Sequence, residues 1–358
     1  MRCDCLADER PVTSCESRSP CALAYFVADQ PARCCVACSG GGVATRGEGQ
    51  CLANEVYLHE CVPGSRCAEE HRALILGTLH VPFELEAAGL AGAILAAVWQ
   101  DSASGQTWVV GSHGQLLGYR DGNWSAYDLQ TKANLIAVWG RVGGDGWIVG
   151  EDGAVFQYDG TRWRARADLP RRVAWRGVAG DADRVVIIGA DGAVLALTDR
   201  WTDLQAPEAH QWVDLVVDRS TVWLLDQQGA LHAFAQGGWR DVELPSGLPL
   251  RAIWQDAQQR LLVADADNRL YRREQERWTQ FASPPPLRAG IADYASAADD
   301  GVWAVGRSGQ IARFIHGGWR LVSYFSASPI EQLYAVFAAK QMVWAVGQPG
   351  VILRAVSL

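Results

Sequence analysis

The sequence of 358 residues has very little lysine and methionine, no long hydrophobic run and no Lys/Arg-rich run. Arginine supplies nearly all of the positive charge, a bias typical of a GC-rich, bacterial coding sequence. The net charge of -8 is spread along the chain, which excludes the basic surface expected of a nucleic-acid-binding protein. The most apolar stretch, residues 90–99, is shorter than the roughly 18–20 residues that cross a bilayer as a helix. We therefore expect no transmembrane segment.

Cysteine is absent after residue 67, and this divides the chain into two parts of different composition. The first part, residues 1–70, exceeds the roughly 8–10% cysteine that marks a disulfide scaffold in a short exported segment. We predict a disulfide-rich module there, with the connectivity left open. A zinc site is the alternative, but no paired C-x-x-C or H-x3-H accompanies the run Cys34-Cys35-Val36-Ala37-Cys38. The candidate disulfide residues are Cys3, Cys5, Cys15, Cys21, Cys34, Cys35, Cys38, Cys51, Cys61 and Cys67.

The cysteine-rich part contains a duplicated unit with the spacing C-x9-C-x5-C, which begins at Cys5 and again at Cys51. An even number of cysteines in a short module favours an oxidising compartment, so we expect an extracellular, cell-surface or periplasmic protein. No secretory signal precedes the cysteines in the residues shown. Export would then require a start further upstream or a leader that has been removed.

Tryptophan recurs at a regular interval through the rest of the chain. Each of these residues follows a turn-like group, such as RDGN before Trp124 or QGG before Trp239, and a short apolar run such as WVVG or WAVG lies further upstream. Further apolar runs of four to six residues complete each unit, so a complete unit contains four short β-strands. Four strands in a unit of about 40 residues predict an all-β β-propeller. The periodic residues are Trp124, Trp163, Trp201, Trp239, Trp278 and Trp319.

Seven units can be counted, and the seventh lacks its fourth strand. The missing strand is predicted at residues 79–85, because LHVPFEL resembles the outer strands of the other units. Pairing one terminus with the other would close the ring and remove its free edges. We thus predict a seven-bladed propeller over residues 76–358, with blades that begin near residues 94, 134, 173, 212, 250, 291 and 333.

The motifs at residues 302–319 and 343–354 resemble the W-A-V-G-x-x-G-x-I-x-R repeats of bacterial propellers related to photosystem II assembly factors and of BNR-type domains. This resemblance implies a propeller of four-stranded blades. The Asp-box of sialidase-like propellers, S-x-D-x-G-x-T-W, occurs only in degenerate form, as in residues 158–163. The resemblance therefore implies the fold and does not carry sialidase chemistry with it.

Charged residues in the innermost strands are the first candidates for a ligand site. When the first strands of the blades are aligned, charges occur only in blades 3 to 6, as Arg176, Asp214, Arg251 and Asp293. Two interpretations stay open. The charges form a ring of salt bridges between blades, or they line a polar ligand-binding mouth.

Two further groups are candidates for ligand binding. Most tryptophans occupy repeat-equivalent positions and are expected to pack between blades, but Trp175 and Trp212 fall outside these positions. The segment 162–176 holds six arginines, among them Arg171 and Arg172, and arginine can bind carboxylates or phosphates with two parallel hydrogen bonds. A solvated strand edge guarded by charge is the simpler explanation of that segment.

Catalytic motifs are missing from the sequence: histidines are scattered, and G-x-S-x-G and phosphate-binding glycine loops do not occur. We expect no enzyme activity, no cofactor and no metal. The sequence predicts an exported scaffold that binds or assembles a protein or glycan partner, through the face that carries the loops into the first strands and the turns between second and third strands. A glycan-active enzyme and a structural subunit of a cell-surface assembly are the alternatives.

Overall fold

A computed structural model describes residues 92–356 apart from 208–210, 219, 286, 288–289, 298–300, 324–329 and 340–341, together with four short strands before residue 92. The chain divides into two units, Met1–Leu79 and His80–Leu358. In the first unit, β1 (Cys35–Ala37) pairs antiparallel with β2 (Glu55–Tyr57). The predicted disulfides and the alternative zinc site involve side chains outside the described residues.

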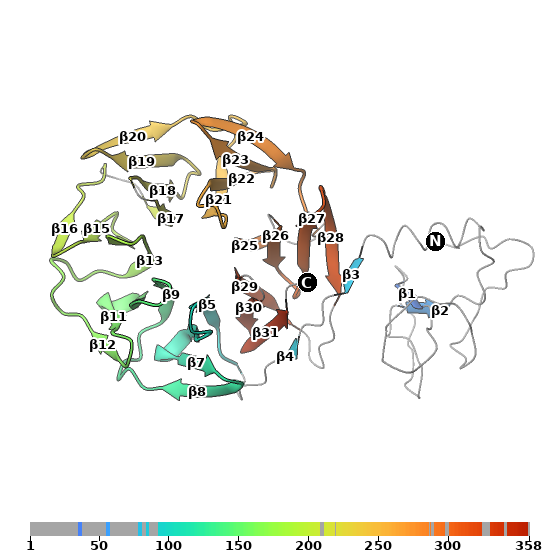
Figure 1. The fold of residues 1–358 in the computed structure, drawn as a ribbon, viewed down its shortest axis with the longest axis horizontal. Helices are drawn as coiled ribbons and strands as arrows, with labels where there is room; N and C mark the ends of the chain where they lie inside the picture. Colours follow the sequence, from blue (N-terminus) through green and yellow to red (C-terminus); the bar gives the residue numbers. More distant parts are fainter. Residues whose placement is uncertain are drawn as a thin grey trace, which may run out of the picture. The chain divides into compact units, whose positions relative to one another are not determined.

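The second unit is a seven-bladed β-propeller whose blades follow one another around a ring (Figure 1). Within each blade the strands are antiparallel, and in blades 1 to 6 the four strands given below follow one another in the sheet as they do in the chain. Blades 1 to 3 comprise β5 (Leu95–Gln100), β6 (Thr107–Gly111), β7 (Leu116–Arg120), β8 (Asn123–Tyr127); β9 (Leu135–Gly140), β10 (Gly146–Gly150), β11 (Val155–Tyr158), β12 (Trp163–Ala165); β13 (Trp175–Gly180), β14 (Val185–Gly189), β15 (Val194–Leu197) and β16 (Trp201–Asp203).

Blades 4 to 7 repeat this arrangement, with the first strand of each innermost in the ring (Figure 1). They comprise β17 (Trp212–Val217), β18 (Val222–Asp226), β19 (Leu231–Ala235), β20 (Gly238–Val242); β21 (Leu250–Gln255), β22 (Leu261–Asp265), β23 (Leu270–Glu274), β24 (Arg277–Ala282); β25 (Ile291–Ser296), β26 (Val302–Gly306), β27 (Ile311–Ile315), β28 (Gly318–Ser323); β29 (Gln332–Ala338), β30 (Met342–Gln348) and β31 (Val351–Val356). The predicted all-β propeller of four-stranded blades is confirmed.

The fourth strand of the seventh blade comes from the N-terminal side of the propeller. β4 (Glu84–Leu85) pairs antiparallel with β31, with Leu85 opposite Leu353. Residues Thr78–His80 form a separate short strand, β3. The ring is thus closed by residues 84–85, the C-terminal end of the stretch 79–85.

Two rows of tryptophans hold the blades together. The row in the second strands is fully buried, as in Trp147, Trp303 and Trp344. The row in the fourth strands is half-buried. Here the Trp239 Nε1–H donates to the Leu204 carbonyl of the preceding blade (2.8 Å), and Trp278 donates to Glu243 in the same way (2.9 Å). The repeated tryptophans therefore link adjacent blades by packing and by hydrogen bonds.

The tryptophan and arginine of the W-A-V-G-x-x-G-x-I-x-R motif are partners across two strands. Trp303 pairs with Arg313 in the β26–β27 register, and the guanidinium lies 4.9 Å from the centre of the indole ring. Trp344 and Arg354 repeat this arrangement at 5.9 Å. A guanidinium over an indole face is a favourable cation–π contact. The motif thus encodes a contact that is internal to each blade.

Only two short 3-10 turns interrupt the strands in the described part of the chain, η1 (Ser112–Gly114) and η2 (Glu151–Gly153). Among the residues described, no helix has the length and apolar character of a membrane span.

Candidate functional site

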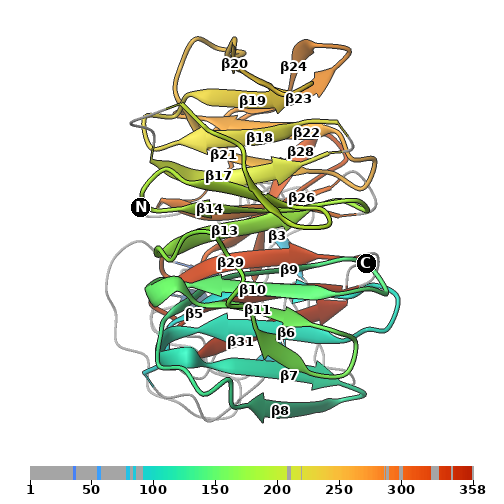
Figure 2. The ribbon, with the colours of Figure 1, turned by 90° about the vertical axis from the view of Figure 1, so that its left-hand side faces the viewer.

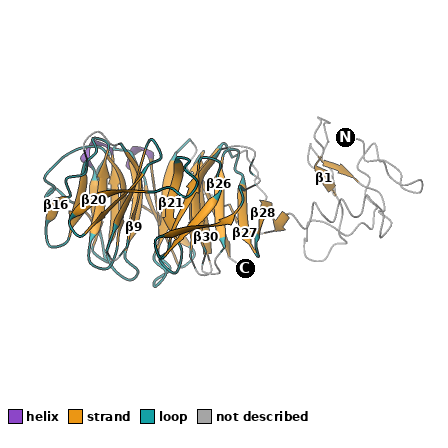
Figure 3. Cartoon of the chain, turned by 90° about the horizontal axis from the view of Figure 1, so that it is seen from above, coloured by secondary structure: helices purple, strands orange, loops and turns teal. Residues whose placement is uncertain are grey.

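Two sets of loops lie at opposite ends of the strands. We call "first face" the end that carries the loops into each innermost strand and the turns between second and third strands, including η1 and η2. The opposite end, the "second face", carries the turns between first and second and between third and fourth strands. Figures 2 and 3 show the strands running from one set of loops to the other. The first face is the one for which ligand binding is predicted from the sequence.

A β-bulge interrupts each innermost strand near the first face. The register shifts at residue 96 in β5 and at the equivalent residue of the other six first strands. A bulge adds one residue and redirects side chains at that point. The four predicted charges fall at these bulges: Arg176 and Arg251 are the extra residues, and Asp214 and Asp293 directly follow the extra residues of β17 and β25.

Asp214 and Asp293 bind the backbone of the next blade. Asp214 Oδ2 accepts the Ile253 N–H (3.3 Å) and Oδ1 accepts the Leu215 N–H (2.8 Å). Asp293 bonds in the same way to the N–H groups of Val336 and Tyr294, both at 2.8 Å. Burial raises the pKa of each carboxyl to about 7, although these hydrogen bonds act in the opposite direction. The negative charge of Asp214 contributes to the raised pKa of Asp293.

The four charges do not form a ring of salt bridges. No ion pair between described residues joins any two of them, and Arg251 instead donates its Nε–H to the Ala266 carbonyl (2.9 Å). Arg176 is exposed. This arrangement argues against the salt-bridge ring. The other interpretation, a polar ligand-binding mouth, stays a prediction.

Trp175 and Trp212 are core residues. Trp175 is fully buried and Trp212 is 2% exposed. Both stand directly before the extra residue of the bulge in an innermost strand, where the other blades carry residues such as Leu95, Leu135 and Leu333. The Trp212 Nε1–H donates to the Gly192 carbonyl of the preceding blade (2.9 Å). Their burial between blades means that neither ring offers a platform to a ligand.

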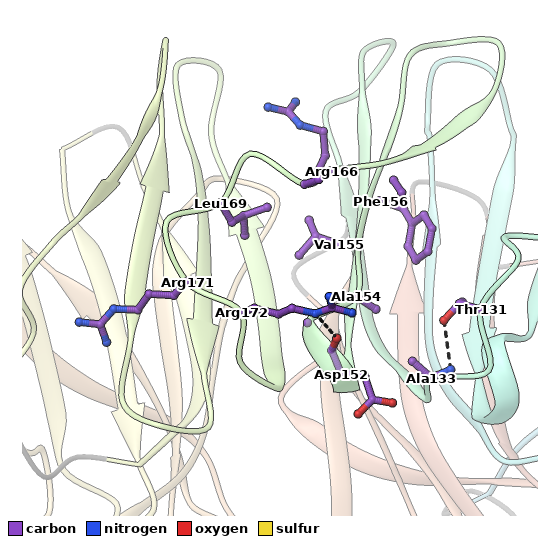
Figure 4. A pocket seen from close by; sticks show the side chains of 13 residues that line it. Thr131, Ala133, Asp152, Ala154, Val155, Phe156, Arg166, Leu169, Arg171 and Arg172 are labelled. Atoms are coloured by element: carbon purple, nitrogen blue, oxygen red, sulfur yellow. Dashed lines mark hydrogen bonds between the residues drawn. The ribbon is translucent and has the colours of Figure 1, made fainter.

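A pocket of about 340 Å3 lies on the first face, around the loop that joins blades 2 and 3 (Figure 4). Its apolar wall is formed by buried Val155 and Phe156 and by half-buried Leu169. The arginines Arg166, Arg171 and Arg172 line its rim. We call it the arginine pocket. It combines an apolar wall with guanidinium groups, the composition that suits an acidic ligand with an apolar part.

The three arginines of the pocket differ in how they are held. Arg166 binds Asp168 through two parallel hydrogen bonds (2.8 and 2.5 Å) and lies over Trp147. Arg171 forms ion pairs with Asp203 (3.2 Å) and Asp191 (3.6 Å).

Arg172 donates its Nε–H only to the backbone carbonyl of Asp152 (3.1 Å), so its charge is not neutralised by any carboxylate in the described structure. Gly153, at φ +75°, makes room for it, since a Cβ there would lie 2.3 Å from Arg172 Cγ. Arg172 is therefore the cation of this pocket that is available to a ligand.

The basic segment 162–176 is thus divided among three places. Arg162 and Arg164 flank or belong to the outer strand β12, where Arg164 pairs with Asp159 (2.9 Å). Arg166, Arg171 and Arg172 are in the pocket, and Arg176 is at the bulge. The charged strand edge predicted from the sequence accounts for Arg162 and Arg164. The ligand-binding hypothesis concerns the arginines of the pocket.

Among the described residues, no three His, Cys, Asp or Glu side chains come together in a way that could bind a metal ion. Sequence reasoning overlooked a second pocket, on the second face, which includes Trp99, Asp101 and Trp108. The turn that follows Trp99 differs in sequence from the turn that follows Trp139, and this difference could have indicated the pocket.

Neither a family model nor a curated protein matches the sequence. Solved structures do match the propeller. They include YCF48 bound to a D1 peptide, with 20% identity, a TM-score of 0.63 and coverage of 78% of this chain and 99% of that chain. A catalytically inactive virginiamycin B lyase from Staphylococcus aureus with quinupristin has 13% identity, a TM-score of 0.66 and coverage of 78% and 100%.

A third match is the extracellular domain of a two-component-system protein from B. thetaiotaomicron, with 11% identity, a TM-score of 0.58 and coverage of 77% of this chain and 42% of that chain. These likenesses establish the fold. They include a propeller bound to a peptide, a lyase and the extracellular domain of a two-component-system protein, and this range shows that the fold alone does not determine an activity.

Proposed function

We propose that the propeller is a non-catalytic scaffold that binds an acidic segment of a partner protein in the arginine pocket. The observation that carries the proposal is the guanidinium of Arg172, which pairs with no carboxylate among the described residues and lies beside the apolar wall of Val155 and Phe156. A carboxylate could bind Arg172 while a neighbouring aliphatic side chain covers the wall. Charge-assisted hydrogen bonds of this kind are stronger than neutral ones and fix the orientation of the bound group.

The matched YCF48 structure supports a protein partner, because that propeller is bound to a peptide. We further propose that residues 1–70 form the cysteine-rich module and 76–358 the propeller, and that the protein acts outside the cytoplasm. The extracellular-domain propeller among the matches is compatible with this location. A glycan partner has no such support in the pocket, whose wall is aliphatic apart from Phe156.

Replacing Arg172 by Ala should weaken the binding of an acidic peptide about tenfold or more, because a hydrogen bond to a charged group contributes about 1.5–3 kcal/mol. The probe is a short peptide with Glu between two Leu residues, and binding is followed by calorimetry. Arg164→Ala is the matched control, since it removes the same charge from an exposed site outside the pocket. The peptide with Gln in place of Glu should bind weakly to the unaltered protein.

Equal affinities of the Arg172→Ala and Arg164→Ala variants would contradict this site. A glycan panel incubated with the protein separates the alternatives. Turnover of any glycan would contradict the non-catalytic proposal, whereas binding of a glycan without turnover would retain a scaffold and change its partner.

A further inference from the structure

A second pocket, of about 220 Å3, lies on the second face between blades 1 and 2. Its lining includes Trp99 and Asp101 of blade 1 and Gly143 and Gly144 of blade 2. This pocket is independent of the arginine pocket, which belongs to the first face. We call it the blade 1–2 pocket.

The next groove around the ring, between blades 2 and 3, shows what the blade 1–2 pocket is built to hold. There Arg141 places its guanidinium 5.7 Å from the centre of the Trp139 ring. Its Nε–H donates to the Asp181 carbonyl of blade 3 (2.8 Å), and Nη1 pairs with Asp145 (2.5 Å). In the groove after that, Arg184 donates to the Asp218 carbonyl of blade 4 (2.9 Å). An arginine of the turn between the first two strands thus reaches the next blade in both grooves.

Blade 1 has the same aromatic floor without the arginine. Trp99 corresponds to Trp139 by strand register, and each ring tip lies against a glycine of the next blade, Gly140 and Gly180 respectively. The turn at residues 101–106 contains no basic residue, and Asp101 occupies the position that Arg141 has in blade 2. The blade 1–2 pocket therefore lies where the neighbouring groove is filled by a guanidinium from the chain itself.

Asp101 gives this pocket a negative charge. Burial by itself raises the pKa of its carboxyl, but hydrogen bonds from Ser104 Oγ (2.6 Å) and from the N–H groups of Gly143 (2.8 Å) and Ala103 (3.0 Å) outweigh it and lower the pKa. The carboxyl is consequently ionised at neutral pH. Asp101 is 9% exposed, and no basic side chain of the described chain pairs with it.

We propose that the blade 1–2 pocket binds an arginine side chain of a partner protein. The indole of Trp99 forms the floor and Asp101 supplies the counter-charge, in the way that Trp139 and Asp145 hold Arg141 in the next groove. One charge opposes this ligand: Arg120 stands at the rim, where its side chain is 64% exposed and only 3.8 Å from the exposed carboxylate of Asp121. Water and salt screen its repulsion.

Binding of the tripeptide acetyl-Gly-Arg-Gly-amide, followed by NMR of the tryptophan indole protons, tests the proposal. The same peptide with citrulline in place of arginine keeps the shape and removes the charge. We expect the arginine peptide to bind at least about tenfold more tightly than the citrulline peptide to the unaltered protein. Equal affinities for the two peptides would overturn the proposal without the use of any variant.

Variants locate the site. Asp101→Asn should weaken binding at least about tenfold, whereas Asp183→Asn, the same change of charge in an exposed turn of the same face outside the pocket, should leave it unchanged. Arg120→Ala should strengthen binding. The double change Asp101→Arg with Gln106→Asp transplants the filled arrangement of blade 2, in which Asp145 corresponds to Gln106, and should abolish binding.

Thermal melting shows whether each variant is folded. A folded Asp101→Asn variant that binds the arginine peptide as tightly as the unaltered protein would overturn the site. A negative result for the blade 1–2 pocket would not contradict the function proposed for the arginine pocket, because the two sites lie on different faces and attract ligands of opposite charge.

Discussion

The propeller should become less stable as the pH rises from about 5 to 8, the reverse of what paired carboxylates produce. Asp214 and Asp293 have pKa values of about 7 in the folded chain against an ordinary value of 3.8. Between these values the folded state binds protons that the unfolded state has released. The free energy of unfolding must therefore fall as the pH rises through this window, and the loss is complete above the folded pKa.

The size of the effect follows from the change in pKa. A move from 3.8 to about 7 corresponds to about 4 kcal/mol for one carboxyl. Both residues are half-buried, and solvent near them screens the charge, so we expect roughly 1–2 kcal/mol for each. The ionisable neighbours of Asp293 are Tyr294, Asp265 and Arg251. Burial and the charges of Asp265 and Asp293 raise the pKa of Tyr294, and the charge of Arg251 lowers it. For a chain of this length the pair should lower Tm by roughly 5–10 °C between pH 5 and pH 8.

Replacing both aspartates by Ala isolates their contribution. Ala is compatible with the backbone there, because Ala97, Ala137 and Ala335 stand at the equivalent bulge position in other blades. At pH 8 the double variant should melt at a higher temperature than the unaltered protein. At pH 5 it should melt at a lower one, since it has lost the hydrogen bonds to Ile253 and Val336. Parallel pH profiles for the two proteins, measured by calorimetry, would contradict the assignment.

The repeat of the tryptophans was sufficient to predict the architecture, because each Trp marks the same place in a four-stranded unit. The first strands could be located to within a few residues from their apolar runs. The four charges of blades 3 to 6 were also recognised, since a charge is conspicuous in a strand that is otherwise apolar. Their pairing could not be predicted. It depends on bulges, at which Arg176 is the extra residue and Asp214 follows the extra residue, and a bulge leaves no signal in hydrophobic periodicity.

The buried tryptophans show the opposite limit. Trp175 and Trp212 were conspicuous because no other blade has Trp at the equivalent place in its first strand. That place is nevertheless a core position, which Leu occupies in other blades, and both tryptophans are buried there. Asp101 was overlooked for a related reason. Acidic residues in turns are ordinary, and only the comparison with Arg141, in its cation–π contact with Trp139, shows that an arginine is missing there. Repeats are most informative where one copy lacks what another supplies.

The two rows of tryptophans should differ sharply in their contribution to stability. Trp344 is fully buried at the junction of blades 7 and 1, where its ring centre lies 5.1 Å from that of Tyr119 and 5.8 Å from that of Trp124. Truncating it to Ala leaves a large cavity and should cost about 3–5 kcal/mol. Trp278 is half-buried and holds one hydrogen bond to Glu243. Trp278→Ala should cost only about 1–2 kcal/mol.

Urea unfolding followed by circular dichroism measures both variants against the unaltered protein. Phe in place of Trp344 is the control, because it keeps an aromatic ring in the pocket and should recover more than half of the lost stability. Equal losses for Trp344→Ala and Trp278→Ala would mean that the outer hydrogen bonds, rather than the buried ring contacts, hold the blades together. A larger loss of stability for Trp344→Ala would show that the ring is held closed mainly by the buried tryptophans of the second strands, where each indole packs against the neighbouring blade.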